Sequence, residues 1–171
     1  MPKEPRFNGT VSKQSHKTMS RIKGKDTRPE IVLRKALWHK GIRYRKNYKG
    51  LPGRPDIVLT RYKIAIFVDS EFFHGKDWDA KKGNVSSGAN GDYWTAKIER
   101  NMARDKEKEH ALRTLDYIVI RFWSRDVLGD TEACVHAVQE AIFAKRIGGI
   151  ADGEIELDER TALLSGKSKE I

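Results

Sequence analysis

Two aspartates and a histidine lie close together in the chain, at the ends of two apolar runs. Asp56 precedes the apolar run 57–59, Asp69 follows the apolar run 64–68, and His74 comes shortly after it. Carboxylate oxygens are the ligands that Mg²⁺ prefers, and an imidazole can take up a proton near neutral pH. These residue types in this order indicate metal-assisted hydrolysis, although an Asp before a strand is by itself an ordinary turn residue.

The elements that must position these residues are two adjacent strands. The run 57–59 is separated from the run 64–68 only by a short turn-like segment over 60–62. A connection this short makes the strands antiparallel neighbours, which brings Asp56 and Asp69 to the same edge of a sheet. The turn alone does not fix the register between the two strands.

Helices and strands alternate along the rest of the chain. The spacing Thr27-x-x-Glu30, with Pro29 in the first turn, predicts a capping box and a helix from Arg28 to Lys40. The pattern then predicts a half-exposed strand over 42–46, a loop over 75–91, a helix over 93–115, a central strand over 117–123 and a last helix over about 130–149. The fold class is therefore α/β, a mixed β-sheet flanked by helices.

The charge of the chain favours a phosphate-bearing partner. Its 34 Lys and Arg against 24 Asp and Glu give a formal net charge of +10. We expect a flexible basic arm over 1–25, one folded domain over 26–149 and an acidic tail over 150–171. The single cysteine excludes an intramolecular disulfide, and no apolar stretch reaches the length of a signal sequence or membrane span. A cytoplasmic protein with no membrane partner is expected.

Several short motifs occur in a fixed order, preceded by the segments 19–22 and 26–30. They are Leu51-Pro52-Gly53-Arg54-Pro55-Asp56, Phe72-Phe73-His74, Tyr93-Trp94-Thr95-Ala96-Lys97-Ile98 and the strand from Val119 to Trp123. Over about residues 15–145 the chain resembles the very-short-patch mismatch repair endonucleases, a branch of the PD-(D/E)XK nuclease superfamily. The resemblance implies a restriction-endonuclease-like fold and a Mg²⁺-dependent DNA endonuclease that nicks duplex DNA at a T:G mismatch.

The resemblance also implies roles for the candidate catalytic residues. Asp56 would be the main Mg²⁺ ligand, the backbone carbonyl of Val68 the second, and Asp69 a direct or water-mediated partner. His74 would be the general base toward the attacking water. Glu30 would orient His74 or a water molecule, and it has a competing local role in the capping box, which we consider the weaker interpretation.

DNA contacts are implied for six residues of three segments: Met19, Phe72, Phe73, Lys97, Asn101 and Asp105. The two phenylalanines would wedge between bases beside a mismatch, aided by the methionine. Without the resemblance, two phenylalanines after a strand are typical of a core. The polar residues of the expected helix recur at intervals of four, which is typical of a solvated face.

The chain departs from the family at its structural zinc site. The positions of the Cys and His ligands correspond to Glu71, Lys76, Trp78 and Ser124, and Cys134 alone cannot replace them, so no structural zinc is expected. Without that zinc-organised loop, strict T:G recognition stays open. Two alternatives remain: a restriction-like or mobile-element nuclease of the same superfamily, and a non-catalytic DNA-binding protein. The oligomeric state is not predicted.

Overall fold

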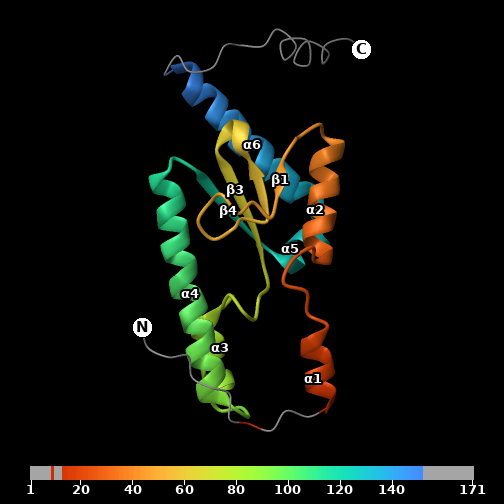
Figure 1. Cartoon of the computed structure of the whole chain (residues 1–171), viewed down its shortest axis with the longest axis vertical. Helices are drawn as coiled ribbons and strands as arrows, with labels where there is room; N and C mark the ends of the chain where they lie inside the picture. Colours follow the sequence, from red (N-terminus) through yellow and green to blue (C-terminus); the bar gives the residue numbers. More distant parts are fainter. Residues whose placement is uncertain (1–8, 10–12, 152–171) are drawn as a thin grey trace.

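The centre of the molecule is a four-stranded mixed sheet, which confirms the predicted fold class. The computed structural model describes Gly9 and residues 13–151. The strands are β1 (Arg45–Lys46), β2 (Ile57–Leu59), β3 (Ile64–Asp69) and β4 (Ile118–Trp123), in the order β1-β2-β3-β4 (Figure 1). β1, β2 and β3 pair antiparallel, and β4 runs parallel to β3.

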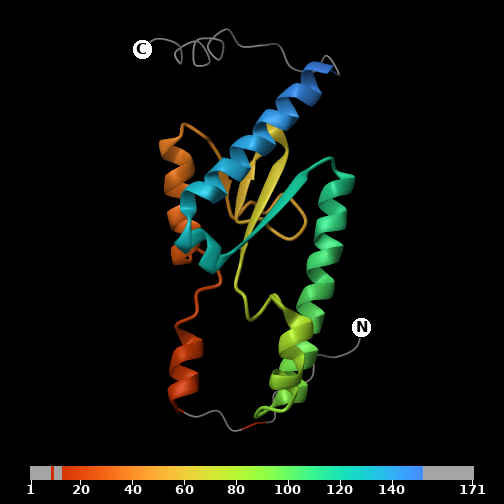
Figure 2. The ribbon, with the colours of Figure 1, turned by 180° about the vertical axis from the view of Figure 1, so that it is seen from behind.

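Helices cover both faces of the sheet. α2 (Arg28–His39), α5 (Ser124–Gly129) and α6 (Thr131–Ala151) lie on one face, where α6 crosses the sheet (Figure 2). The main core is on this face and includes Leu33, Ile64, Ile66 and Val135. On the other face, Leu112 of α4 (Gly91–Thr114) packs against β3 residues with the opposite orientation. The alternation of a β-strand therefore turns every second residue of β3 and β4 toward α4.

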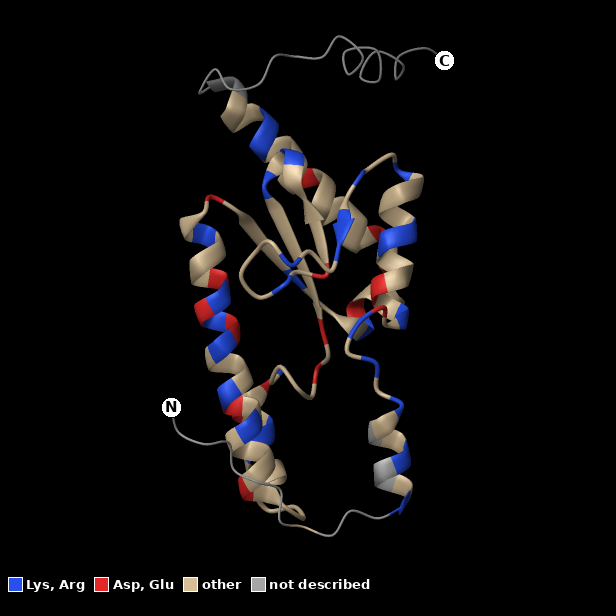
Figure 3. Cartoon of the chain, viewed as in Figure 1, with Lys and Arg blue, Asp and Glu red and all other residues tan. Residues whose placement is uncertain are grey.

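Two projections extend from the same end of the sheet. One contains α1 (Lys13–Ser20), and the other contains α3 (Trp78–Ser86) packed along the first half of α4 (Figure 1). Lys and Arg residues occur on α1, on the segment leading into α2 and along α4 (Figure 3). Within the described ranges, no helix has the length and apolarity needed to span a bilayer.

The predicted hairpin and the two predicted helices on either side of it are confirmed. α2 and α4 end within a few residues of the predicted bounds, and β2 joins β3 through the 3-10 turn Thr60–Tyr62. The register, which the sequence left open, pairs Ile57 with Ile66 and Val58 with Ala65.

Other predictions differ from the structure. The strand expected to be central, β4, is at the edge of the described sheet, and its apolar run is explained by helices on both of its faces. The expected loop over 75–91 contains α3, and the expected strand over 42–46 forms only two residues of β1. Part of the expected basic arm forms α1, and α5 was not anticipated. Most of the acidic tail, from residue 152 onward, is outside the described residues.

Candidate active site

Asp56 and Asp69 line one cavity at the end of the hairpin. Val68 donates its backbone N–H to Asp56 Oδ2 at 2.8 Å, so Asp56 is fixed against the end of β3. Burial raises the pKa of Asp56 to about 6, since the Val68 hydrogen bond offsets it only in part and the charges of Glu30 and Asp69 add to it. A carboxylate in this position would be stabilised by a bound cation.

His74 is held against α4 by the loop that follows β3. His74 Nδ1 lies 2.6 Å from Asp105 Oδ2 and 3.7 Å from Asp69 Oδ1. The loop can approach α4 this closely because residue 75 is glycine, with φ +70° and space for no Cβ, which would lie 2.5 Å from Met102 Sδ. Burial opposes the protonated imidazole, but the Asp105 hydrogen bond and the charges of Asp69 and Asp105 outweigh it, so the pKa of His74 is raised.

Two residues of the polar row on α4, Asn101 and Asp105, face this loop. Asn101 Nδ2 donates to the backbone carbonyl of Phe73 at 3.0 Å, one turn before Asp105 reaches His74. Lys97 lies a turn further back, with Nζ 3.2 Å from the Tyr93 hydroxyl. The solvated-face interpretation of this row is therefore wrong for Asn101 and Asp105, whose side chains position the loop.

Glu30 lines the cavity and is also tied to the start of α2. Its Oε2 accepts the backbone N–H of Asp26 at 2.9 Å, and its Oε1 accepts the Thr27 hydroxyl at 2.8 Å. Glu30 bonds the backbone N–H of Asp26, the residue before the N-cap Thr27, and the Thr27 side chain caps no backbone N–H of α2. The predicted capping box is therefore formed only in altered form. Glu30 is buried, with 3% of its surface exposed, and its charge acts on Asp56.

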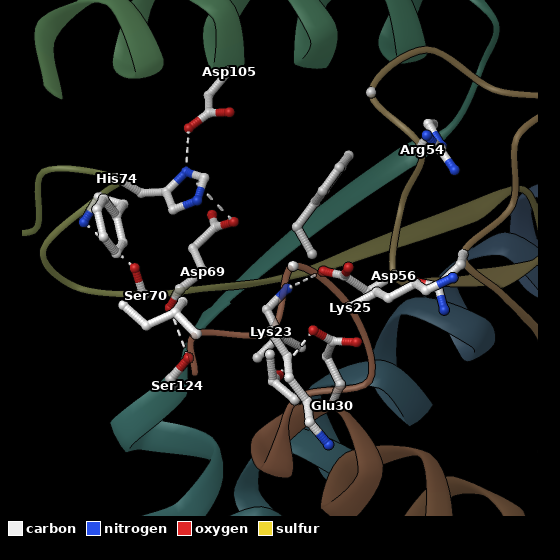
Figure 4. Close-up of a pocket in the computed structure, with 18 of the residues that line it drawn as sticks. Lys23, Lys25, Glu30, Arg54, Asp56, Asp69, Ser70, His74, Asp105 and Ser124 are labelled. Carbon is white, nitrogen blue, oxygen red and sulfur yellow. Dashed lines mark hydrogen bonds and ion pairs between the residues drawn. The ribbon is translucent and has the colours of Figure 1, made fainter. Parts of the chain in front are cut away.

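The cavity has a volume of about 770 Å³ and a rim of cations (Figure 4). Its lining contains acidic groups and His74, and the cations are Lys23, Lys25, Arg54 and Lys108. The sequence did not identify these four residues as functional, although Arg54 belongs to the motif that runs from Leu51 to Asp56. Arg54 takes a left-handed backbone conformation with φ +52°, which costs a non-glycine residue conformational energy.

Aromatic side chains cluster beside the cavity. Phe72 lies 5.2 Å from Phe73 and 5.4 Å from Trp94, measured between ring centroids. Phe73 is half-buried and lines the cavity, whereas Phe72 is 47% exposed. The pair is therefore not part of a closed core, and Phe72 is accessible to solvent. Lys97 Nζ lies 5.4 Å from the Trp94 centroid. Met19 belongs to α1, and its side chain is outside the described residues.

The four positions that correspond to zinc ligands make other contacts. Glu71 Oε1 accepts the backbone N–H of Arg125 at 2.7 Å, and Ser124 Oγ donates to the backbone carbonyl of Asp69 at 3.1 Å. Lys76 Nζ lies 3.5 Å from Asp126 Oδ1, and Trp78 is buried and donates to Glu99. These contacts connect the His74 loop directly to α5 and α4.

The donor set at Asp56 suits a hard divalent cation. Among the described residues, no three His, Cys, Asp or Glu side chains converge to hold a metal by themselves. Mg²⁺ does not require such a group, because it binds through one or two carboxylates, retains several water molecules and takes oxygens from a substrate phosphate. The Asp56 carboxylate, a strand-end carbonyl at Val68 and an open cavity fit this requirement.

Comparisons with known proteins show the family of the chain. The family model for DNA mismatch endonuclease Vsr matches residues 10–80. The chain is 44% identical over 133 residues to the type II nicking enzyme V.NmeDIP of Neisseria meningitidis serogroup C, covering 78% of this chain and 88% of that protein. It is 47% identical over 123 residues to the type II nicking enzyme V.HpaIIP of Haemophilus parainfluenzae, covering 72% and 86%. The DNA mismatch endonuclease Vsr of Escherichia coli K12 is 28% identical over 140 residues, covering 82% and 88%.

The fold is of the restriction-endonuclease-like class, with acidic residues at the end of a hairpin. The chain belongs to the DNA mismatch endonuclease Vsr family and is a DNA endonuclease. Nucleases of this family are generally metal-dependent.

Proposed function

We propose that this protein nicks one strand of duplex DNA by Mg²⁺-dependent hydrolysis of a phosphodiester bond, in the manner of very-short-patch mismatch repair. The observation that carries the proposal is the single cavity that joins Asp56 to the hydrogen-bonded pair of His74 and Asp105. The names of relatives from Neisseria and Haemophilus, type II nicking enzymes, support cleavage of one strand. We expect the enzyme to act in the cytoplasm, with residues 26–149 as its nuclease domain.

Each residue of the site has a defined task in this reaction. Asp56 and the Val68 carbonyl would hold Mg²⁺, and a bound Mg²⁺ would stabilise negative charge on the phosphate and the leaving oxygen. Asp69 would be a partner of the ion, either direct or through a water molecule. Glu30 sets the charge near Asp56 and orients water in the cavity.

His74 handles the proton of the attacking water. Its Nδ1 faces the Asp105 carboxylate, so Nδ1 carries a hydrogen and Nε2 is available as the acceptor. The neutral imidazole is the active base, and the imidazolium that forms is stabilised by Asp105. Asn101 keeps the loop in place through the Phe73 carbonyl.

The cationic rim and the aromatic cluster would bind the DNA. Lys23, Lys25, Arg54 and Lys108 surround the acidic centre at positions suited to phosphates. Phe72 is exposed beside Trp94, and we propose that it enters a base step, with Phe73 supporting it and Met19 as a further DNA contact. A mismatch lowers the energy needed to unstack that step.

The test is cleavage of supercoiled plasmid and of end-labelled duplexes with and without a T:G mismatch. Open circles mean nicking and linear product means paired cleavage. We expect Mg²⁺-dependent nicking at the mismatch, abolished in Asp56→Asn and retained in Asp79→Asn, an acidic control on the exposed surface of α3. Cleavage of matched DNA at equal rates would contradict mismatch recognition. Tight DNA binding without cleavage under any divalent ion would contradict the proposed endonuclease activity.

A further inference from the structure

Arg121 of β4 is held among three acidic residues beside the cavity. Its Nη1 lies 2.6 Å from Asp69 Oδ2, its Nη2 lies 3.8 Å from Asp105 Oδ1, and its Nε lies 3.6 Å from Glu109 Oε2. The guanidinium also lies over the Phe67 ring, with Cζ 4.4 Å from the centroid. Only 23% of the side chain is exposed. Contacts on so many sides give the guanidinium one orientation.

The sheet places this arginine beside Asp69. β3 and β4 are parallel with Phe67 opposite Arg121, so Asp69, two residues further along β3, points to the same face. The second Asp69 oxygen lies 3.7 Å from His74 Nδ1, His74 bonds Asp105, and Asp105 faces Arg121. These four side chains form a closed ring in which cationic and anionic groups alternate when His74 is protonated.

Asp56 differs from Asp69 in its close partner. Asp56 accepts its 2.8 Å hydrogen bond from the backbone N–H of Val68, which carries no net charge. Asp69 receives its 2.6 Å contact from a guanidinium. The charge of Asp69 is therefore matched inside the protein, and the charge of Asp56 is available to a cation in the cavity.

We propose that Arg121 is a positioning residue that holds Asp69 outside the inner coordination shell of the metal, so that Asp56 is the side-chain carboxylate that binds the ion directly. This inference rests on the proposed function. Turning Asp69 toward the ion would break a charge-assisted contact at a site where 8% of the Asp69 side chain is exposed, and would leave Arg121 without its nearest anion.

The experiment measures Mn²⁺ binding to the whole protein without DNA, by the paramagnetic resonance signal of the free ion. Asp69→Asn with Arg121→Met removes the ion pair without changing the net charge, and we expect a dissociation constant within about threefold of the wild type. Arg121→Met alone frees Asp69 to bind the ion, so we expect binding roughly tenfold tighter. Arg61→Met is the matched control, because Arg61 is exposed in the turn Thr60–Tyr62, at the other end of the hairpin from the cavity.

Two outcomes would overturn the role of Arg121. If the double variant binds Mn²⁺ tenfold more weakly or worse, Asp69 is itself an inner ligand; if Arg121→Met binds no more tightly than wild type, Arg121 does not restrain Asp69. Where Arg121→Met fails to fold, the double variant decides, since it removes Arg121 together with the charge of its nearest anion, Asp69. Asp56→Asn tests the proposed function separately: Mn²⁺ binding that survives this change removes the proposed metal site, whatever Arg121 does.

Discussion

His74 and Asp105 are joined by a 2.6 Å contact between Nδ1 and Oδ2, although one lies on the loop after β3 and the other in the middle of α4. The contact fixes both the ring orientation and the tautomer of the imidazole. It also raises the pKa of His74 against the effect of burial. The base of the reaction thus depends on packing between two segments that are distant in sequence.

Asp105→Asn should lower the pKa of His74, because it removes the charge and the hydrogen bond that raise it. A base must be unprotonated, so the acidic limb of the profile of kcat/KM against pH should move to lower pH. The rate at neutral pH should fall by at least about tenfold, since the tautomer is no longer enforced. Cleavage rates measured across the pH range test this. An unmoved limb, or an equal effect of Glu107→Asn on the exposed surface of α4, would contradict the pairing.

Asp56→Asn should stabilise the protein in the absence of divalent ions. Burial raises the pKa of Asp56 from 3.8 to about 6, so the folded state binds the proton more tightly than the unfolded state. Stability is therefore lost as pH rises from about 4 to about 6, and the cost persists above pH 6. Removing the charge should raise the free energy of unfolding at pH 8 by on the order of 2 kcal/mol, with little gain at pH 4.

Urea unfolding in chelator at the two pH values measures this difference. Asp79→Asn serves as control, because its side chain is exposed. A gain for Asp56→Asn that is the same at both pH values would mean that ionisation is not its source. Added Mg²⁺ should stabilise the wild type and leave Asp56→Asn unchanged.

Phe72→Ala should weaken binding to a mismatched duplex more than binding to a matched one. Phe72 is 47% exposed in the aromatic cluster with Trp94, and insertion of its ring is useful only where bases unstack easily. We expect about a tenfold loss on the mismatched duplex, the lower end of what stacking on one base contributes. Equilibrium binding of both duplexes measures it. Phe143→Ala, which removes a 65% exposed ring from α6, should change neither affinity.

Arg54→Ala and Lys108→Ala should each reduce the dependence of DNA binding on salt. If each side chain neutralises one phosphate, the slope of log K against log salt should become less steep by about 1 per residue. Both changes should weaken matched and mismatched duplexes alike, since phosphates carry no sequence information. Arg61→Ala is the control, because Arg61 lies in the turn at the other end of the hairpin. An unchanged slope would remove the residue from the phosphate-binding set.

The parts of the site that could be predicted are those encoded by patterns of residues near one another in the sequence. The hairpin brings Asp56 and Asp69 to one edge because its turn is short, and α2 and α4 have clear helical spacing. Family resemblance added the choice of His74. In each case the information is contained in a few consecutive residues.

The parts that the sequence missed depend on packing. Arg121 reads as one polar residue inside an apolar strand, and only the parallel register of β3 and β4 shows that it faces Asp69. The role of Asp105 at His74 likewise depends on how α4 crosses the loop. β4 was predicted to be central because its run is apolar, but it is an edge strand with helices packed on both faces, and its six residues are half-buried.

The Glu30 carboxylate has two positions of influence, because it bonds the residues at the start of α2 and also lines the cavity. Thr27→Val removes the hydroxyl that bonds Oε1 at 2.8 Å and leaves the charge, so we expect a loss of about 1 kcal/mol in unfolding free energy and nearly normal cleavage. Glu30→Gln removes the charge that acts on Asp56, so cleavage should fall at least about tenfold beyond any effect of stability. Unfolding and cleavage measured for both variants separate the roles. If cleavage follows stability equally in the two variants, Glu30 acts only at the start of α2.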